Sequence, residues 1–166
     1  MIYEDMLRNG YQKILIFEDD AVPDDRALPL IPHILEELPA NWELLMWGWD
    51  KNGSPPATAG LKKIFYHLKN RMGSLKWDHQ MIRNLYAQPY SKHLKKAGFH
   101  DYTYAYAISA SAAQKLVAMQ TPIQYIADNL LAHAATKEFL KSFISWPVIF
   151  LHEDPGPAGT VNSYIR

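Results

Sequence analysis

The sequence predicts an α/β fold in which helices flank a mostly parallel sheet. In the strand predicted over 13–17, residues 14–17 form a short apolar run that leads into carboxylates, which is typical of a strand buried on both faces. Apolar residues at helical spacing over about 26–38 follow, and a second buried strand is predicted over 43–49, where an apolar run follows Glu43. This strand–helix–strand order, with a connection as long as a helix, favours two neighbouring parallel strands.

Further elements are expected along the rest of the chain. They are a helix over 2–9, a strand rich in aromatic residues at 102–108, helices over 112–119 and about 125–135, and one or two strands within 142–151. Residues 53–100 show no clear period and are expected to form an irregular loop or insert, within which 63–68 resembles a strand. Residues 152–166 are rich in proline and glycine and are expected to form a C-terminal tail.

Composition is that of one globular domain spanning residues 1–166. The chain is 48% apolar and 13% aromatic, enough for a real core. Lys and Arg number 17 and so do Asp and Glu, so the net charge of zero argues against a nucleic-acid partner. The lack of Cys excludes disulfides, thiolate metal sites and a Cys nucleophile, and fits a reducing compartment. No apolar run is long enough to span a bilayer, and no signal peptide is visible.

Three carboxylates, Glu18, Asp19 and Asp20, directly follow the predicted strand 13–17. In open α/β sheets the ligand site lies beyond the carboxyl ends of the strands, so the triplet is expected at the rim of a site. Adjacent carboxylates repel one another, and a hard divalent cation such as Mg²⁺ or Mn²⁺ is their natural partner. The alternative is a solvated strand end or a helix cap.

Five segments, taken in order, carry a resemblance to a known family. They are Glu4-Asp5-Met6-Leu7 through Gly10-Tyr11, residues 14–21, Trp42-Glu43-Leu44-Leu45, residues 104–109 with 112–116, and Pro122-Ile123 ahead of Asp128. In this order and at this spacing they resemble glycosyltransferase family 25, the sugar transferases that modify lipopolysaccharide and collagen. The pattern spans most of residues 4–151, and its middle part is the poorest match.

The resemblance implies a GT-A-like, Rossmann-like fold and a hexosyltransferase. The enzyme would move a sugar from a nucleotide-sugar donor, such as a UDP-sugar, to a glycan such as the lipopolysaccharide core. In such folds a DXD-like acidic motif holds Mn²⁺ or Mg²⁺ against the donor diphosphate. Asp20 is then the first choice of metal ligand, Glu18 reaches the metal or the donor ribose, and Asp19 belongs to the donor site. His152 would complete the metal shell, with a structural histidine as the alternative.

The resemblance also supplies candidates for catalysis and donor binding. Asp128 would be the base that takes the proton of the acceptor hydroxyl in an inverting transfer, or a carboxylate that favours a helix N-terminus. Tyr104 and Tyr106 would stack on the sugar or base, although at least one of them is expected to pack in the core. Ser109 is assigned to the donor site, and Ser109 or Ser111 is also a candidate cap for the helix at 112–119.

Members of the family usually begin with a strand bearing an Asn-x-Asp or x-Arg-Arg-like segment, whereas this chain opens within the first helix. We therefore expect a domain that is incomplete at its N-terminus, with an exposed sheet edge that favours a homodimer. One alternative is a non-catalytic remnant that binds a sugar or a partner. The other is a two-component receiver domain, suggested by residues 13–20 and Asp50, but Asp50 is not followed by Met-Pro.

The expected location is cytoplasmic, with the inner face of the bacterial membrane as one place of action. We expect any membrane association to come from residues outside this chain. The six basic residues from Lys62 to Arg83 could bind phosphate groups, and the alternative interpretation is that they lie in a solvated loop.

Overall fold

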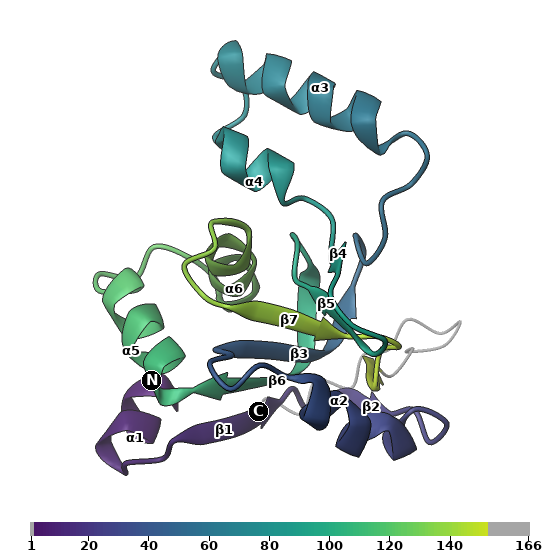
Figure 1. Ribbon diagram of the computed structural model, residues 1–166. Helices are drawn as coiled ribbons and strands as arrows, with labels where there is room; N and C mark the ends of the chain where they lie inside the picture. The colour runs from purple at the N-terminus through teal and green to yellow at the C-terminus, as the bar shows by residue number, and fades with distance from the viewer. Residues whose placement is uncertain (1, 153–166) are drawn as a thin grey trace, which may run out of the picture.

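The computed structural model describes residues 2–152, and within them a mixed six-stranded sheet forms the centre of the molecule (Figure 1). Its strands lie in the order β1 (Lys13–Phe17), β6 (Asp101–Ser109), β3 (Leu44–Asp50), β7 (Ser142–Ser145), β5 (Leu94–Lys96) and β4 (Gln88–Pro89). Among the described strands, only β3 and β7 pair in parallel. Two further short strands, β2 (Ala21–Pro23) and β8 (Phe150–His152), form an antiparallel pair.

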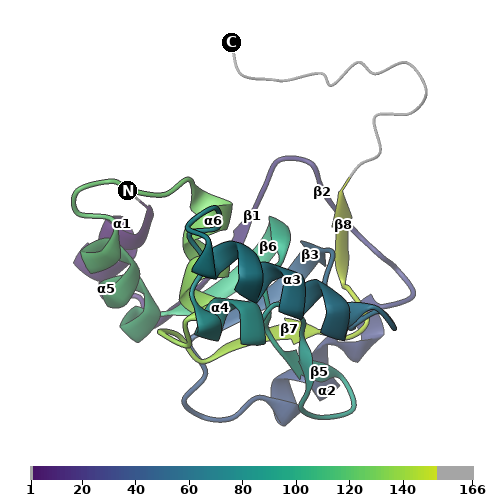
Figure 2. The ribbon, with the colours of Figure 1, turned by 90° about the horizontal axis from the view of Figure 1, so that it is seen from above.

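Helices cover both faces of this sheet (Figures 1 and 2). On one face lie α1 (Ile2–Arg8), α5 (Ala110–Met119) and α6 (Ala127–Thr136). On the other lie a 3₁₀ helix (Leu28–Leu30) and α2 (Ile31–Glu37). The remaining pair, α3 (Ala59–Arg71) and α4 (His79–Arg83), stands away from the sheet beyond α6.

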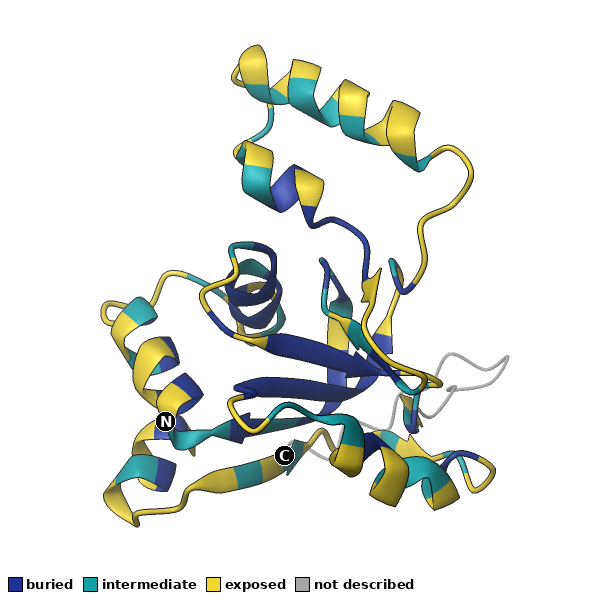
Figure 3. Cartoon of the chain, viewed as in Figure 1, coloured by how far each residue is buried: buried dark blue, intermediate teal, exposed yellow. Residues whose placement is uncertain are grey.

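The alternation of side chains along β3 divides the core into two apolar clusters within the described residues. Leu44 and Met46 contact the helices α1, α5 and α6, whereas Leu45 and Trp47 point to the face that α2 covers. Residues 44–49 are all buried, so β3 is the strand enclosed on both faces (Figure 3). Burial of this run on both sides explains why its sequence is continuously apolar.

Strand β1 differs from its prediction in two ways. It is not the neighbour of β3, because β6 lies between them and pairs antiparallel with both. It is also not buried on both faces, because it is an edge strand whose Leu15 and Phe17 each remain 49% exposed. An apolar run predicts a strand but does not identify its partner. The α/β class with flanking helices is confirmed, while the sheet is mixed and not mostly parallel. Dimerisation through the exposed edge stays a prediction.

The prediction that residues 53–100 form an irregular loop is wrong. It contains α3, α4 and the antiparallel pair β4–β5, and the segment 63–68 that resembled a strand lies within α3. Asp78 begins α4 by accepting a hydrogen bond from the Met81 amide at 3.0 Å.

The helices expected over 2–9, 112–119 and 125–135 are confirmed to within a few residues as α1, α5 and α6. The helix expected over 26–38 is shorter, since the stretch before Ile31, which includes Pro29, forms a 3₁₀ turn. Of the expected tail, 153–166 lies outside the described residues.

Glu43 fixes the start of β3 to two other elements. The residue is 7% exposed, and its carboxylate accepts hydrogen bonds from Ser111 Oγ at 2.7 Å, Lys115 Nζ at 2.9 Å and the Lys141 amide at 3.0 Å. Burial alone would raise the pKa of Glu43, but these donors outweigh it and hold the pKa below its ordinary value. One carboxylate therefore joins β3 to α5 and to the segment that precedes β7.

We expect Glu43→Ala to lower the free energy of unfolding by about 1–3 kcal/mol at neutral pH, because it removes a nearly buried carboxylate that accepts three hydrogen bonds. A carboxylate with a lowered pKa stabilises the fold above its unfolded-state pKa and loses that contribution as the pH falls through its folded-state pKa. The deficit of the variant should therefore shrink in acid. Urea denaturation at several pH values measures this difference in the free energy of unfolding.

Glu36→Ala, which removes only an exposed pair with His33, is the control and should lower the free energy of unfolding by under ~0.5 kcal/mol. Equal losses in the two variants would contradict the assignment.

Candidate active site

Polar residues from three strands meet at one edge of the sheet, an edge that is formed by strand ends and is distinct from the edge strand β1. Strands β1 and β3 run in the same direction because each pairs antiparallel with β6. Their carboxyl ends therefore share the edge at which β6 begins. Glu18 directly follows β1, Asp50 ends β3, and Thr103 lies near the start of β6. The Glu18 amide donates to the Tyr104 carbonyl at 2.8 Å, which holds the acidic triplet against β6.

Thr103 joins two of the predicted site residues. Its hydroxyl is 2.9 Å from Asp128 Oδ1 and 3.4 Å from Glu18 Oε1, and the residue is 1% exposed. A hydroxyl has one proton, so at these distances Thr103 donates mainly to Asp128. Asp128 lies in the first turn of α6, as the sequence predicted, and Ile126 at the N-cap supplies no side-chain cap. Glu18, Thr103 and Asp128 are called the acidic cluster below.

The acidic cluster carries unbalanced negative charge. Burial raises the pKa of Glu18, and the neighbouring charges of Asp128 and Asp20 raise it further, while the Thr103 hydroxyl acts in the opposite direction. Burial, together with nearby carboxylates of which Asp50 is the foremost, also raises the pKa of Tyr104 to about 12. Burial is the larger cause of both shifts, and the part that comes from neighbouring carboxylates is the part that a positive charge would offset.

Residues 18–21 form the turn between β1 and β2, in which the Ala21 amide donates to the Glu18 carbonyl at 3.2 Å. Asp19 and Asp20 are exposed in this turn. His152 lies opposite Ala21 in the β2–β8 pair, and its ring centroid is 5.3 Å from that of Tyr104. The fold therefore brings residues from three separate parts of the sequence to the same edge: Glu18 and Asp20, Tyr104, and His152.

The side chains of residues 2–152 form no group of three or more His, Asp or Glu that is placed to hold a metal ion. The predicted ligands Glu18, Asp20 and His152 come from the same end of the sheet, but their side chains are not gathered into such a group. Carboxylate oxygens and an imidazole nitrogen are nevertheless the donor types that Mn²⁺ takes.

Two predicted residues lie elsewhere. Ser109 ends β6, opposite Lys13, and is separated from Thr103 by the length of the strand, ~20 Å at the rise of a strand. Its hydroxyl accepts a hydrogen bond from the Ala112 amide at 3.2 Å and caps α5. The hydroxyl of Tyr106 is hydrogen-bonded to that of Tyr3 at 3.0 Å inside the core. The expectation that one of the two tyrosines packs in the core is confirmed for Tyr106.

Thr103 was missed because its orientation depends on an irregularity in β6. Tyr102 has a left-handed backbone, with φ of 58°, and the register between β3 and β6 shifts on either side of Gly48. Such bulges break the strict alternation on which sequence reasoning relies. The signal available was Gly48 itself, because glycine inside a strand often marks a bulge. A Cβ at this position would lie 2.7 Å from the Phe150 carbonyl oxygen and 2.9 Å from Tyr104 Cβ.

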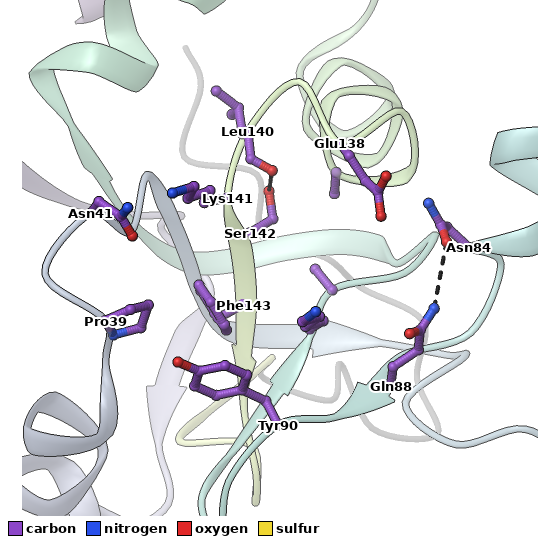
Figure 4. Close-up of a pocket in the computed structure, with 13 residues that line it drawn as sticks. Pro39, Asn41, Asn84, Gln88, Tyr90, Glu138, Leu140, Lys141, Ser142 and Phe143 are labelled. Carbon is purple, nitrogen blue, oxygen red and sulfur yellow. Dashed lines mark hydrogen bonds between the residues drawn. The ribbon is translucent and has the colours of Figure 1, made fainter.

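A pocket of about 440 Å³ lies on another part of the molecule (Figure 4). It is lined by residues of mixed polarity, among them Asn84, Gln88, Tyr90, Lys141 and Phe143, and Gln88 Nε2 donates to Asn84 Oδ1 at 3.4 Å. None of the predicted site residues lines it. The acidic cluster is therefore the candidate site because of its chemistry and its place at the strand ends, and not because of the size of a cavity.

Comparison with known proteins agrees with the resemblance in the sequence. The family model described as glycosyltransferase family 25 (LPS biosynthesis protein) matches residues 1–131. This span includes the acidic cluster and Asp20, and it ends before β7 and His152. A comparison with curated proteins found no match. Because the family model covers most of the chain, this protein belongs to glycosyltransferase family 25, a family of lipopolysaccharide-biosynthesis glycosyltransferases.

Proposed function

We propose that this chain transfers a sugar from a nucleotide-sugar donor, a UDP-sugar, to a hydroxyl of a glycan such as the lipopolysaccharide core. The observation that carries the proposal is the acidic cluster at the shared edge of β1, β3 and β6. Ligands of open α/β sheets bind beyond such strand ends. Membership of family 25 removes the receiver-domain alternative, in which Asp50 would accept a phosphoryl group.

In this proposal a divalent cation, Mn²⁺ or Mg²⁺, is held by Asp20 and Glu18, with His152 as a third ligand. The raised pKa of Glu18 supports a cation there, because a positive charge would offset the repulsion from Asp20 and Asp128. Such a cation would supply a Lewis acid for the negative charge that develops on the nucleoside diphosphate.

Asp128 serves as the base of an inverting transfer. Thr103 fixes its carboxylate through Oδ1, and among residues 2–152 no hydrogen bond reaches Oδ2. The acceptor hydroxyl attacks the anomeric carbon, the bond to the diphosphate breaks, and the hydroxyl proton passes to Asp128. Thr103 thereby acts as a positioning residue for the base.

An aromatic surface next to the cluster suits the donor. The rings of Tyr102 and Tyr104 stack at 5.9 Å with an interplanar angle of 8°, and Tyr102 is 49% exposed. Tyr104 itself is 8% exposed, so the ring available to pack on a sugar or a base is that of Tyr102. Asp19 lies exposed in the β1–β2 turn and is assigned to the donor. Ser109 is left out of the proposed site because its hydroxyl caps α5.

The proposed metal site predicts that UDP binding depends on Mn²⁺. We expect calorimetric titration to show UDP binding to the wild type with Mn²⁺, and Asp20→Asn to weaken it at least ~10-fold, because a metal ligand is lost. Asp25→Asn, which removes an exposed carboxylate just beyond β2, should bind as the wild type does. Equal affinity with and without Mn²⁺ would overturn the metal role. Failure of the wild type to bind UDP would favour the non-catalytic alternative.

The raised pKa of Glu18 predicts an effect on stability with a definite sign. A carboxyl group whose folded-state pKa is raised destabilises the fold once it ionises, so stability is lost as the pH rises through that pKa. Glu18→Gln should therefore raise the melting temperature of the metal-free protein at neutral pH. The gain should fade toward about pH 4, where the unfolded-state carboxyl is also protonated. Thermal melts measure it, with Glu36→Gln as the exposed control. A variant less stable than the wild type at neutral pH would contradict the assignment.

The role of Asp128 predicts a loss of turnover with binding retained. Asp128→Asn should lower kcat for release of UDP from a UDP-sugar by about 10²–10⁴-fold, since that is the usual contribution of a general base. The affinity for UDP should stay within about threefold, because Asp128 is assigned to the acceptor and not to the diphosphate. Thr103→Val should lower kcat less, and Thr103→Ser should restore it. A rise in KM with unchanged kcat would assign Asp128 to binding.

A further inference from the structure

Helix α3 turns its apolar side to solvent. Its apolar residues recur at intervals of three and four, which places them on one stripe of the helix and of the turn that follows. All are more than half exposed: Leu61 71%, Ile64 67%, Phe65 51%, Leu68 55% and Met72 73%. Figure 3 shows the exposed side of α3 facing away from the rest of the molecule. An amphipathic helix normally buries such a stripe, so α3 lacks a cover within the described residues.

The opposite, polar side of α3 faces the protein. Lys63 Nζ donates to the Arg83 carbonyl at 2.6 Å, and Asn70 Nδ2 donates to the Trp77 carbonyl at 2.5 Å. The ring of Tyr66 meets that of Trp77 edge to face at 5.6 Å. These contacts anchor α3 to α4 and to the loop between them. The outward direction of the apolar stripe is therefore set by specific bonds on the other side of the helix.

The apolar stripe is bordered by cations. At about 100° per residue, Lys62 and Lys69 fall on one side of it and Arg71 on the other. Residues 51–77 contain no Asp or Glu, although the whole chain has 17 acidic and 17 basic residues. A neutral protein thus concentrates positive charge around one exposed apolar helix face. Such a face matches a surface that is apolar inside and anionic outside.

We propose that α3 docks this protein onto the surface of a membrane that contains anionic lipids. The apolar stripe, about 20 Å long for a helix of 13 residues, lies at the boundary between headgroups and acyl chains. Lys62, Lys69 and Arg71 contact lipid phosphates. No helix in residues 2–152 is long and apolar enough to cross a bilayer, so the helix lies in the plane of the surface. This differs from our expectation that any membrane association comes from outside the chain.

The charges disfavour a second copy of this chain as the cover of the stripe. A two-fold dimer places the same face of both molecules in contact, so the cations that border one stripe would meet those that border the other. Nucleic acid would attract the cations through its phosphates, but it would not bury the five exposed apolar side chains. The residues of α3 take no part in the acidic cluster, so this proposal does not rest on the proposed catalytic function.

Vesicle binding tests the proposal. In co-sedimentation, we expect the wild type to bind phosphatidylcholine vesicles containing about one third phosphatidylglycerol at least tenfold more tightly than vesicles of phosphatidylcholine alone. Binding to the anionic vesicles should weaken as salt rises. The double variant Ile64→Ser/Phe65→Ser should lose at least about tenfold in affinity, because it removes apolar area from the stripe. Leu35→Ser on α2, which is 51% exposed, is the matched control and should bind like the wild type.

A spectroscopic readout tests the docked face directly. The fluorescence of Phe65→Trp should shift to the blue with anionic vesicles, whereas that of Leu35→Trp should not. The double variant should keep its melting temperature and its Mn²⁺-dependent UDP affinity, which separates loss of docking from misfolding. Equal binding of the double variant and the wild type would overturn the proposal. So would dimers in solution that the double variant abolishes, or an acidic protein partner captured by the stripe without any binding to anionic vesicles.

Discussion

Strand β6 lies between β1 and β3 and pairs antiparallel with both, and the position of the candidate site depends on that arrangement. Both neighbours must then run in one direction. Glu18 after β1 and Asp50 at the end of β3 therefore lie at the same end of the sheet as Thr103, which is near the start of β6. A slip of one residue in the register would turn Thr103 away from Asp128. Gly48 supports the geometry, since its missing Cβ lets Tyr104 and the Phe150 backbone approach β3.

Two glutamates near opposite ends of the sheet show how one residue type serves two purposes. Glu43 is nearly enclosed, yet three donors satisfy it, and its pKa falls below the ordinary value. Glu18 is less enclosed, but it meets Asp128 and Asp20 with one weak donor, and its pKa rises. The first arrangement stabilises the fold. The second costs stability, and such a cost is typical of a site that is completed by a ligand.

The sequence predicts those features that depend on local pattern. Apolar residues at helical spacing predict α1, α5 and α6. Carboxylates that directly follow an apolar run predict that Glu18 and Asp20 lie at the end of a strand. Pairing depends on tertiary structure, so the edge position of β1 and the insertion of β6 could not be predicted from apolar runs. Thr103 depends on a bulge and on the left-handed Tyr102, which alternation does not encode. The helical spacing of apolar residues in α3 is present in the sequence. Lys residues stand between them, so the segment showed no clear period and α3 was not predicted.

The net charge of zero conceals two regions of opposite sign. Residues 51–77 are wholly free of acids, whereas Glu18, Asp20, Asp50 and Asp128 gather at the strand ends. An anionic membrane surface attracts the first region and repels the second wherever the second lies within about one Debye length, ~10 Å at moderate salt. A divalent cation at the acidic cluster would cancel part of that repulsion. Under the two proposals, metal binding and docking through α3 would therefore act in the same direction, because each would lower the electrostatic cost of bringing this protein to a surface of lipid phosphates.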